Sequence, residues 1–453
     1  MANVSAVFAP RNASGGARPE TPPDRVRRLT IDGKILRADA AGGRQLFPHP
    51  EPELRKINTL TFRRATRTTA REINRQIALN LVREHEPISR ADLQPPGEVT
   101  SLISELIAEG SIYEGDTAEA PRGRKPRMLY IRTRDRLVVS IDVRLSRTYL
   151  MLNDFAGTQI ALESFETILD PEVLTAELVR RVRRLLESHG AAGRCEGIGL
   201  VVPGMVDRRT GRIQHAPQLG WRDVDVRGPL AAGTGLEVYI ENAPIACALA
   251  QIWLGQKGDS NSDFVYVTVS DGVGAGIVVN GEVVRGHDNS AGEFGHIPIV
   301  SDGPQCLCGA RGCLEVYASN IATLSRYLKR EIATGAPRER LQSLPLTIND
   351  VVDRAHAGDA AARAALLESA RYIGIGLAII INSLNPSRIF VGGEITAAWD
   401  LLEPTLRAAV KERALTAAAA QTPILPEHVG GLPRLRGATA LVAAPLFAAP
   451  HLA

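Results

Sequence analysis

The sequence predicts an α/β protein in which a small helical domain precedes two α/β lobes. Two observations support this prediction. Apolar residues recur at helical spacing between Thr69 and Gly110. From Leu137 onward, apolar strands are followed by helices, and this order occurs twice. Two such lobes in one chain predict a cleft between them, and ligand sites commonly lie in such clefts.

Length and composition limit the class of protein. The chain has 453 residues, a formal net charge of +3 and 44% hydrophobic residues, which is enough for two or three domains with their own cores. It contains no run of about 18 consecutive apolar residues, which a membrane span requires. Its first residues lack a basic segment followed by an apolar one. We therefore expect a cytoplasmic protein with no membrane partner.

The charge is distributed unevenly along the chain. Residues 1–134 hold 23 Lys and Arg against 16 Asp and Glu, a net +7, so the remaining 30 against 34 give −4. A basic N-terminal part favours a polyanionic partner such as DNA. A solvated, arginine-rich surface explains the same excess equally well.

The N-terminal segment, residues 1–60, is rich in Ala, Gly, Pro and Arg and has no sustained periodicity. Such a segment cannot bury enough apolar surface to offset the entropy lost on ordering. We expect a disordered arm.

Residues 61–134 are predicted to form a winged helix-turn-helix domain. A first helix begins near Thr69, Ser89 is the expected N-cap of a short second helix over 90–93, and a third spans 98–109 and ends at Gly110. The residues expected to face the core are Ile73, Ile77, Leu81, Val82, Val99, Leu102, Ile103 and Leu106. A two-stranded wing follows. In this fold the third helix enters the major groove of DNA.

We predict double-stranded DNA as a partner, contacted mainly from the third helix. That helix carries no Lys or Arg, so a basic arm, "APRGRKPRM" (120–128), would have to supply phosphate contacts. A plain basic linker is the alternative interpretation of this arm. The candidate DNA-binding residues are Arg90, Thr100, Ser101, Ser104, Arg122 and Arg124.

The two lobes are predicted to occupy residues 135–453. The first lobe begins with a strand over 137–143 and a hairpin that turns at 154–157. An amphipathic helix then ends at Gly190. In the second lobe we expect helices over 315–334 and 360–384.

Three of the five cysteines lie within eight positions, in "CLCGARGC" (306–313). Cys306, Cys308 and Cys313, with His296 upstream, offer the Cys3His ligand set of a structural zinc site. Two alternatives remain open at this point. The thiols could be reduced and metal-free, or they could form a redox pair, although the usual C-x-x-C spacing is absent.

The segments "SAGEFGHIPI", "CLCGARGCLEVYAS", "GIGLVVPGMVD" and "VYIENAPIACALAQ" resemble motifs of the ROK family, which groups bacterial transcriptional repressors with sugar kinases. The resemblance covers Leu137 to the C-terminus and the helix-turn-helix. It implies a two-lobed actin-like, ribonuclease-H-like fold, a structural zinc in a loop over 292–316, and a homodimer or homotetramer. It also implies a sugar site in the cleft. The sugar contacts that it implies are Asn242, Glu293, His296 and Glu315.

The sequence departs from the kinases of that family at two places. In the kinases an aspartate follows the counterpart of Asn242 and acts as general base, whereas here Ala243 cannot accept a proton. The phosphate loop, "SIDVRLSRT", keeps Asp142 but places Arg144 and Leu145 where backbone would have to approach phosphate. We therefore predict no catalytic residue and no enzymatic activity.

These observations together predict a bacterial DNA-binding regulator, acting as a repressor of carbohydrate-metabolism genes and controlled by a sugar or sugar derivative. Two alternatives are kept. One is a ROK sugar kinase with an added N-terminal domain. The other is a ligand-binding relative that has lost DNA binding, because "QPPG" (94–97) leaves the helix-turn-helix shorter than in the family.

Overall fold

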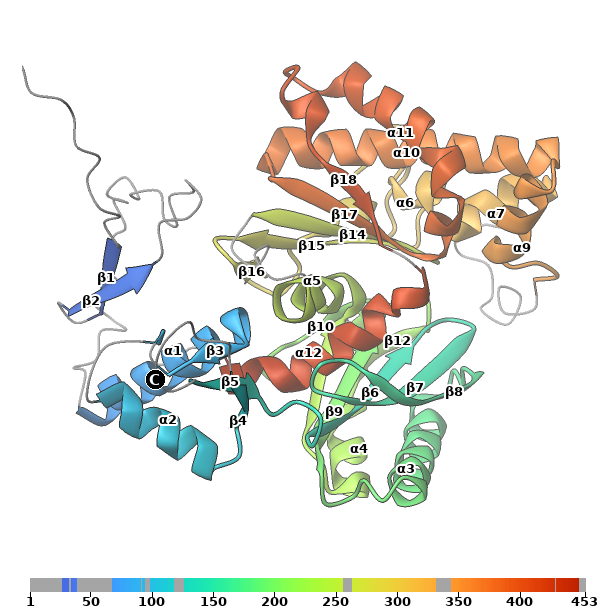
Figure 1. The fold of residues 1–453 in the computed structure, drawn as a ribbon. Coiled ribbons are helices and arrows are strands. Elements are labelled where there is room, and N and C mark those ends of the chain that lie inside the picture. Colours follow the sequence, from blue (N-terminus) through green and yellow to red (C-terminus); the bar gives the residue numbers. More distant parts are fainter. Residues whose placement is uncertain are drawn as a thin grey trace, which may run out of the picture. The chain divides into compact units, whose positions relative to one another are not determined.

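The computed structural model describes residues 27–31, 34–38, 67–90, 92–93, 98–117, 126–255, 263–330, 344–427 and 429–447. The chain divides into two compact units (Figure 1). The smaller unit holds Met1–Val82 and Glu86–Tyr130, and the larger holds Ile131–Pro450.

Part of the N-terminal arm is paired, contrary to the prediction of disorder. Strands β1 (Arg27–Ile31) and β2 (Lys34–Ala38) form an antiparallel hairpin in which Ile31 faces Lys34. The sequence between them is Asp-Gly, which favours a two-residue hairpin turn. The rest of the predicted arm lies outside the described residues.

The smaller unit combines two helices with a three-stranded sheet of order β3-β5-β4. Its elements are α1 (Arg67–His85), β3 (Ile88–Ser89), α2 (Glu98–Ala108), β4 (Ile112–Thr117) and β5 (Arg127–Ile131). Helix α2 buries Leu102, Ile103 and Leu106 as predicted. It ends before Gly110, whose φ of +74° suits a residue without a side chain. The predicted third helix and wing strands are therefore present.

The buried face of α1 differs from the prediction. Val82 is buried as predicted, but Ala78 and Leu79 are buried as well, whereas the predicted Ile77 and Leu81 are only half-buried. Residues 78 and 82 form the row next to 77 and 81 on a helix of 3.6 residues per turn. The helix is thus rotated by about one residue relative to the predicted face.

The predicted second helix, over 90–93, is a turn in the described residues of that stretch. The backbone N–H groups of Asp92 and Leu93 both donate to the carbonyl of Ser89, at 3.1 and 3.3 Å. The Ser89 hydroxyl donates to the Asp92 carboxylate at 2.6 Å, so it stabilises a turn rather than a helix N-terminus. A helix could not continue, because Pro95 and Pro96 have no N–H to donate.

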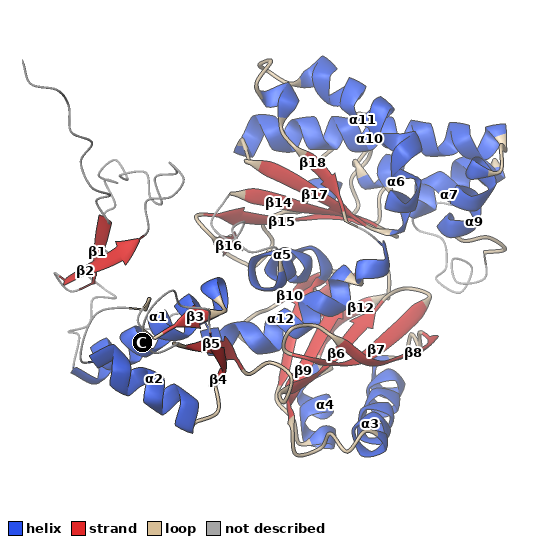
Figure 2. Ribbon diagram, in the orientation of Figure 1, coloured by secondary structure: helices blue, strands red, loops and turns tan. Residues whose placement is uncertain are grey.

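The first lobe of the larger unit is built on a five-stranded sheet of order β13-β9-β6-β7-β8 (Figure 2). Every residue of β6 is buried, because helices cover both faces of the sheet. A small sheet, β10-β11-β12, follows β9. The elements of this lobe are β6 (Leu137–Val143), β7 (Arg147–Asp154), β8 (Gln159–Glu166), α3 (Pro171–Ser188), β9 (Cys195–Val202), β10 (Met205–Val206), β11 (Ile213–Ala216), β12 (Trp221–Val224), α4 (Arg227–Thr234) and β13 (Val238–Asn242).

The second lobe is built on a sheet of order β16-β15-β14-β17-β18, with its main helices on the outer face. Its elements are β14 (Phe264–Val269), β15 (Val273–Val279), β16 (Glu282–Val284), η1 (Phe294–His296), α6 (Glu315–Ala318), α7 (Asn320–Leu328), α9 (Ile348–His356), α10 (Ala360–Leu384), β17 (Arg388–Gly392), η2 (Glu394–Ala398), α11 (Trp399–Arg413), η3 (Ala419–Gln421), β18 (Ile424–Pro426) and η4 (Val429–Gly431). The helix predicted over 315–334 is interrupted, because Ser319 caps a new helix by accepting from the Ala322 N–H at 3.2 Å.

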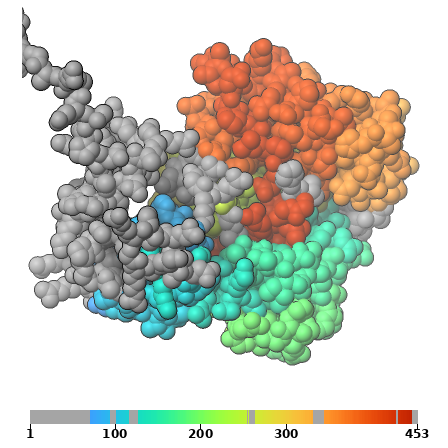
Figure 3. Space-filling model, in the orientation of Figure 1, coloured from blue at the N-terminus to red at the C-terminus, as the bar shows by residue number. Residues whose placement is uncertain are grey.

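Two helices lie between the sheets. Helix α5 (Ala243–Leu254) begins where β13 of the first lobe ends, and it packs on β14 and β15 of the second. Helix α12 (Pro433–Phe447) returns from the second lobe and packs on α5, β6 and β9. Figure 3 shows the lobes as two masses, the first in green and the second in orange. The predicted two-lobed fold is confirmed.

Within the part of the chain that the structure describes, only α10 is long and apolar enough to cross a membrane. Of its most apolar window, 61% is buried inside the second lobe, where Leu366, Ile373 and Leu377 belong to the core. Its apolar composition is thus accounted for by packing against α11, α9 and the sheet.

Candidate functional site

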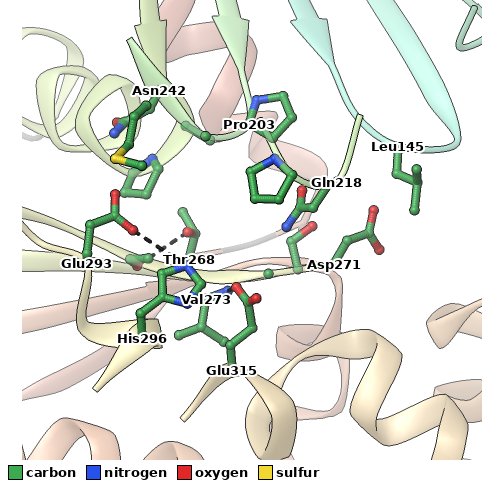
Figure 4. Close-up of a pocket in the computed structure, with 18 of the residues that line it drawn as sticks. Leu145, Pro203, Gln218, Asn242, Thr268, Asp271, Val273, Glu293, His296 and Glu315 are labelled. Carbon is green, nitrogen blue, oxygen red and sulfur yellow. Dashed lines mark hydrogen bonds and ion pairs between the residues drawn. The ribbon is translucent and has the colours of Figure 1, made fainter. Parts of the chain in front are cut away.

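A cavity of about 170 Å³ lies between the two lobes. The first lobe contributes Pro203, Gln218 and Asn242 to its wall, and the second contributes Asp271, Glu293, His296 and Glu315 (Figure 4). The four residues predicted to contact a sugar therefore line one cavity, although they come from three separate stretches of the chain.

Asn242 ends β13 and is the N-cap of α5. Its side-chain oxygen accepts from the Ile245 N–H at 3.0 Å, which satisfies one of the free donors of the first helical turn. Its own N–H donates to the buried Glu241 carboxylate at 2.9 Å. Glu241 is in turn paired with Arg285 of the second lobe. These contacts hold the Asn242 side chain at the cavity wall.

The two carboxyl groups predicted to face a sugar differ in their exposure to water, and the Glu293 side chain is 36% exposed. Glu315 is 6% exposed and accepts from the Val273 N–H at 2.9 Å. Burial raises its pKa to about 7. Burial also raises the pKa of Glu293, with opposition from His296. Near neutral pH the Glu315 carboxyl can therefore both accept and donate hydrogen bonds, as sugar hydroxyls do.

His296 lies between the cavity and the cysteines. Its Nε2 is 3.8 Å from the Glu293 carboxylate and its Nδ1 is 3.5 Å from the sulfur of Cys306. The sulfurs of Cys308 and Cys313 are 3.7 Å apart, and all four ligand atoms lie within 4.8 Å of one another. A tetrahedral zinc separates its sulfur and nitrogen ligands by roughly 3.5–3.8 Å. The four residues could therefore hold a metal ion.

The loop that carries the cysteines depends on two glycines. Gly309 and Gly312 have φ angles of +95° and +67°, where residues with a side chain are strained. A Cβ on Gly312 would also lie 1.6 Å from the carbonyl oxygen of Val300. The loop can therefore close around a bound ion only with glycine at these positions.

The region that would bind phosphate in a kinase contains a network of ion pairs. Arg144 Nε is 2.6 Å from the fully buried Asp142, and its Nη1 pairs with Glu394 of the second lobe. Arg434 Nε lies 2.8 Å from the other Asp142 oxygen. Asn320 donates to Glu394 at 2.9 Å. Arg144 thus links the lobes where the sequence predicted an obstruction.

The glycines at 272, 274 and 276 serve close packing. A Cβ on Gly274 would lie 2.7 Å from the Pro244 ring, and one on Gly276 would lie 2.4 Å from the Pro244 carbonyl oxygen. The first turn of α5 therefore rests directly on β15. Only Gly272 belongs to a turn, accepting from the Ser270 N–H at 2.9 Å.

The sequence reasoning missed several residues that line the cavity, among them Gln218, Asp271 and Arg434. Asp271 follows the apolar strand β14 by two residues, and an acidic residue at that place was a usable signal. Gln218 and Arg434 lie outside any chemical motif. They reach the cavity only through the packing of the small sheet and of α12.

The predicted DNA contacts are only partly brought together. Arg90 pairs with Glu114 at 2.7 Å and donates to the Ser104 hydroxyl at 3.4 Å. Ser101 lies in α2, as Ser104 does, and is exposed. Thr100 lies in the first turn of α2, and Arg122 and Arg124 lie outside the described residues.

Two acidic residues, one in α2 and one directly after it, are paired with α1. Glu105 pairs with Arg71 and Glu109 pairs with Arg75. Part of the positive charge of this unit is therefore neutralised internally, which weakens the expectation of strong phosphate binding from α1.

Comparison with known proteins places these observations in a family. The sequence matches the ROK family over residues 138–444. It is 30% identical to the xylose repressor of Caldicellulosiruptor bescii over 363 residues, which cover 77% of this chain and 90% of that protein. It is 36% identical to the glucokinase of Halalkalibacterium halodurans over 231 residues, which cover 49% of this chain and 68% of the glucokinase.

A solved structure is similar over most of both chains. It is a ROK family transcriptional regulator described as a homologue of the Escherichia coli MLC protein. It has a TM-score of 0.69 and 28% identity, and the alignment covers 84% of this chain and 97% of the other. The family match extends over about two thirds of the sequence, so the chain described here belongs to the ROK family.

Proposed function

We propose that this chain is a sugar-responsive transcriptional regulator that represses carbohydrate-metabolism genes. Residues 61–134 would bind a double-stranded DNA operator, and residues 135–453 would bind the sugar. The observation that carries the proposal is the extent of the similarity. The alignment with the related regulator covers 84% of this chain, which is a larger share than the larger unit alone makes up. The alignment with the glucokinase covers 49%.

The cavity supports a binding role rather than phosphoryl transfer. Ala243 is buried with Val201, Ala246 and Ala438, and its methyl group cannot remove a proton from a sugar hydroxyl. Arg144 is committed to two carboxylates, and Leu145 is buried against Ile321. Neither side chain leaves room for backbone to approach a nucleotide phosphate. A sugar kinase is therefore the disfavoured alternative.

We propose that the sugar contacts are Asn242, Glu293, His296 and Glu315, and that His296, Cys306, Cys308 and Cys313 hold a structural zinc. The ion would supply rigidity, because all four ligands belong to the loop at 292–316. Within that loop the backbone already pairs Ile299 N–H with Gly312 at 2.8 Å and Leu314 N–H with Ile297 at 3.0 Å. Glu293 and Glu315 lie at the two ends of this loop, so fixing the loop positions both carboxyl groups.

Sugar binding would control DNA binding by shifting the population between two conformations. This requires a sugar that binds the two conformations with different affinity. The DNA contacts that we propose are Arg90, Thr100, Ser101, Ser104, Arg122 and Arg124. The homodimer or homotetramer and the cytoplasmic location stay predictions.

The internal pairing of α2 favours a second candidate, a relative that binds a ligand but no longer binds DNA. Helix α2 has no basic residue, and the acidic groups Glu105 and Glu109 are held by α1. DNA affinity would then depend on the basic arm alone.

Selection of genomic fragments on the purified zinc-loaded protein, repeated with a panel of sugars, tests the proposal. Enrichment of a discrete inverted repeat that one sugar alters is the expected result. Enrichment no greater than a salt-sensitive background would support the second candidate. Sugar-dependent release of phosphate from ATP would instead support the kinase.

A further inference from the structure

Asp271 has a position in the cavity that the proposed function does not explain. It lies between β14 and β15, and Figure 4 shows it near Leu145 and Gln218, away from Asn242 and Glu293. Within the described ranges, no side chain or backbone group forms a hydrogen bond or ion pair with its carboxylate. An unpaired carboxylate facing a cavity is costly unless a ligand or water binds it.

The charges around Asp271 leave it as the unmatched group. The nearby cations are Arg144 and Arg434, and the nearby anions include Asp142 and Glu394. Arg144 pairs with both Asp142 and Glu394, and Arg434 pairs with Asp142. Two guanidinium groups thus face at least three carboxylates, counting Asp271, so acidic groups outnumber basic ones at this end of the cavity.

This charge decides which ligands the end of the cavity can accept. A phosphate placed there would face the Asp271 carboxylate in a poorly solvated space, where like charges repel strongly. It would find both guanidinium groups already paired. A hydroxyl group, in contrast, can donate a hydrogen bond to the free carboxylate, and bonds to charged acceptors are the stronger ones.

We infer that Asp271 selects an unphosphorylated sugar as the ligand of this cavity, by accepting a hydrogen bond from a sugar hydroxyl and excluding a phosphate group. The inference rests on the proposed function, because it concerns the same cavity. It makes Asp271 a specificity-determining residue, and it narrows the ligand class from sugars and sugar phosphates to neutral sugars.

The test is isothermal titration calorimetry of the full-length, zinc-loaded chain with matched pairs. The pairs are glucose with glucose 6-phosphate, N-acetylglucosamine with its 6-phosphate, and xylose with its 5-phosphate. We expect at least one neutral sugar to bind tenfold or more tightly than its phosphate. Asp271→Asn keeps the size of the side chain and removes its charge, so it should reduce that preference by about tenfold. Asp353→Asn, on the exposed face of α9, makes the same change of charge outside the cavity and should leave the preference unchanged.

The outcomes separate this inference from the function on which it rests. Tighter binding of a phosphorylated sugar would overturn the inference while supporting a sugar-responsive protein. An unchanged preference in Asp271→Asn would also overturn it, since the discrimination would then come from other groups. Binding of none of the six compounds, in a protein that retains zinc and its native circular dichroism, would overturn both.

Discussion

Replacement of Arg144 by alanine tests whether the ion-pair network holds the lobes together. Burial alone would lower the pKa of this guanidinium, but Asp142 and Glu394 raise it, so the group is charged at every relevant pH. The change would leave the fully buried Asp142 with Arg434 as its remaining ion-pair partner. It would leave Glu394 with the Asn320 amide.

The expected loss in the free energy of unfolding is about 2–4 kcal/mol. Removing one partner of a buried pair typically costs about 3–5 kcal/mol, because the other charge is left uncompensated. The loss here should be somewhat smaller, since both carboxylates keep one contact. The three tryptophans, Trp221, Trp253 and Trp399, all lie in the larger unit, so fluorescence during urea unfolding reports on that unit.

Two controls make the Arg144 measurement decisive. Arg180→Ala removes the same side chain from an exposed pair with Glu177 on α3, and it should change the stability little. A double-mutant cycle with Glu394→Gln isolates the contact between lobes, with an expected coupling of about 1–3 kcal/mol. If Arg144→Ala behaves like Arg180→Ala and the coupling is zero, the network does not stabilise the arrangement of the lobes.

Four further predictions concern the metal, the ligand and the buried carboxyl. The purified chain should contain about one zinc ion. Cys313→Ser should remove the zinc, whereas Cys195→Ser, at the start of β9, should retain it. Elemental analysis that finds no metal in folded wild-type protein would contradict the assignment. Glu293→Ala should weaken sugar binding tenfold or more in calorimetry without lowering the melting temperature, whereas Glu282→Ala on β16 should change neither. Ala243→Asp alone should not create sugar-dependent ATP hydrolysis, because Arg144 still fills the phosphate region, and turnover in that variant would disprove this reasoning. Burial raises the pKa of Asp271 to about 6, so the wild type should lose stability as the pH rises from about 4 to 6. Above that range Asp271→Asn should be the more stable protein, by at most about 3 kcal/mol. Equal urea midpoints of the two proteins at pH 7 would refute this.

Local patterns predicted the strands, whereas the family resemblance predicted much of the cavity. The apolar run of β6 and the amphipathic spacing of α3 each reflect burial within a few residues, so they can be read directly. Asn242 and Glu315 were predicted to face the cavity because each lies in a segment that resembles a ROK-family motif, and both line it. Conversely, Arg434 was missed because its contact with Asp142 joins residues almost three hundred positions apart.

The errors have local physical causes. The helix predicted over 90–93 does not form, because two prolines follow it. The Ser89 hydroxyl therefore bonds to Asp92 within a turn and does not cap a helix. The hairpin within the arm was overlooked because composition was weighed over the single Asp-Gly pair. The face of α1 was misjudged by one residue, since two adjacent apolar rows compete and only tertiary packing selects between them.

The close approach of Pro244 to Gly274 and Gly276 has a consequence for evolution within the family. These glycines set the smallest separation that α5 and β15 can reach. A single methyl group at either position would act as a wedge that holds the lobes further apart, without touching any residue that we assign to the sugar. Relatives with identical sugar contacts could therefore differ in how open they are at rest, and hence in how they respond to the same ligand.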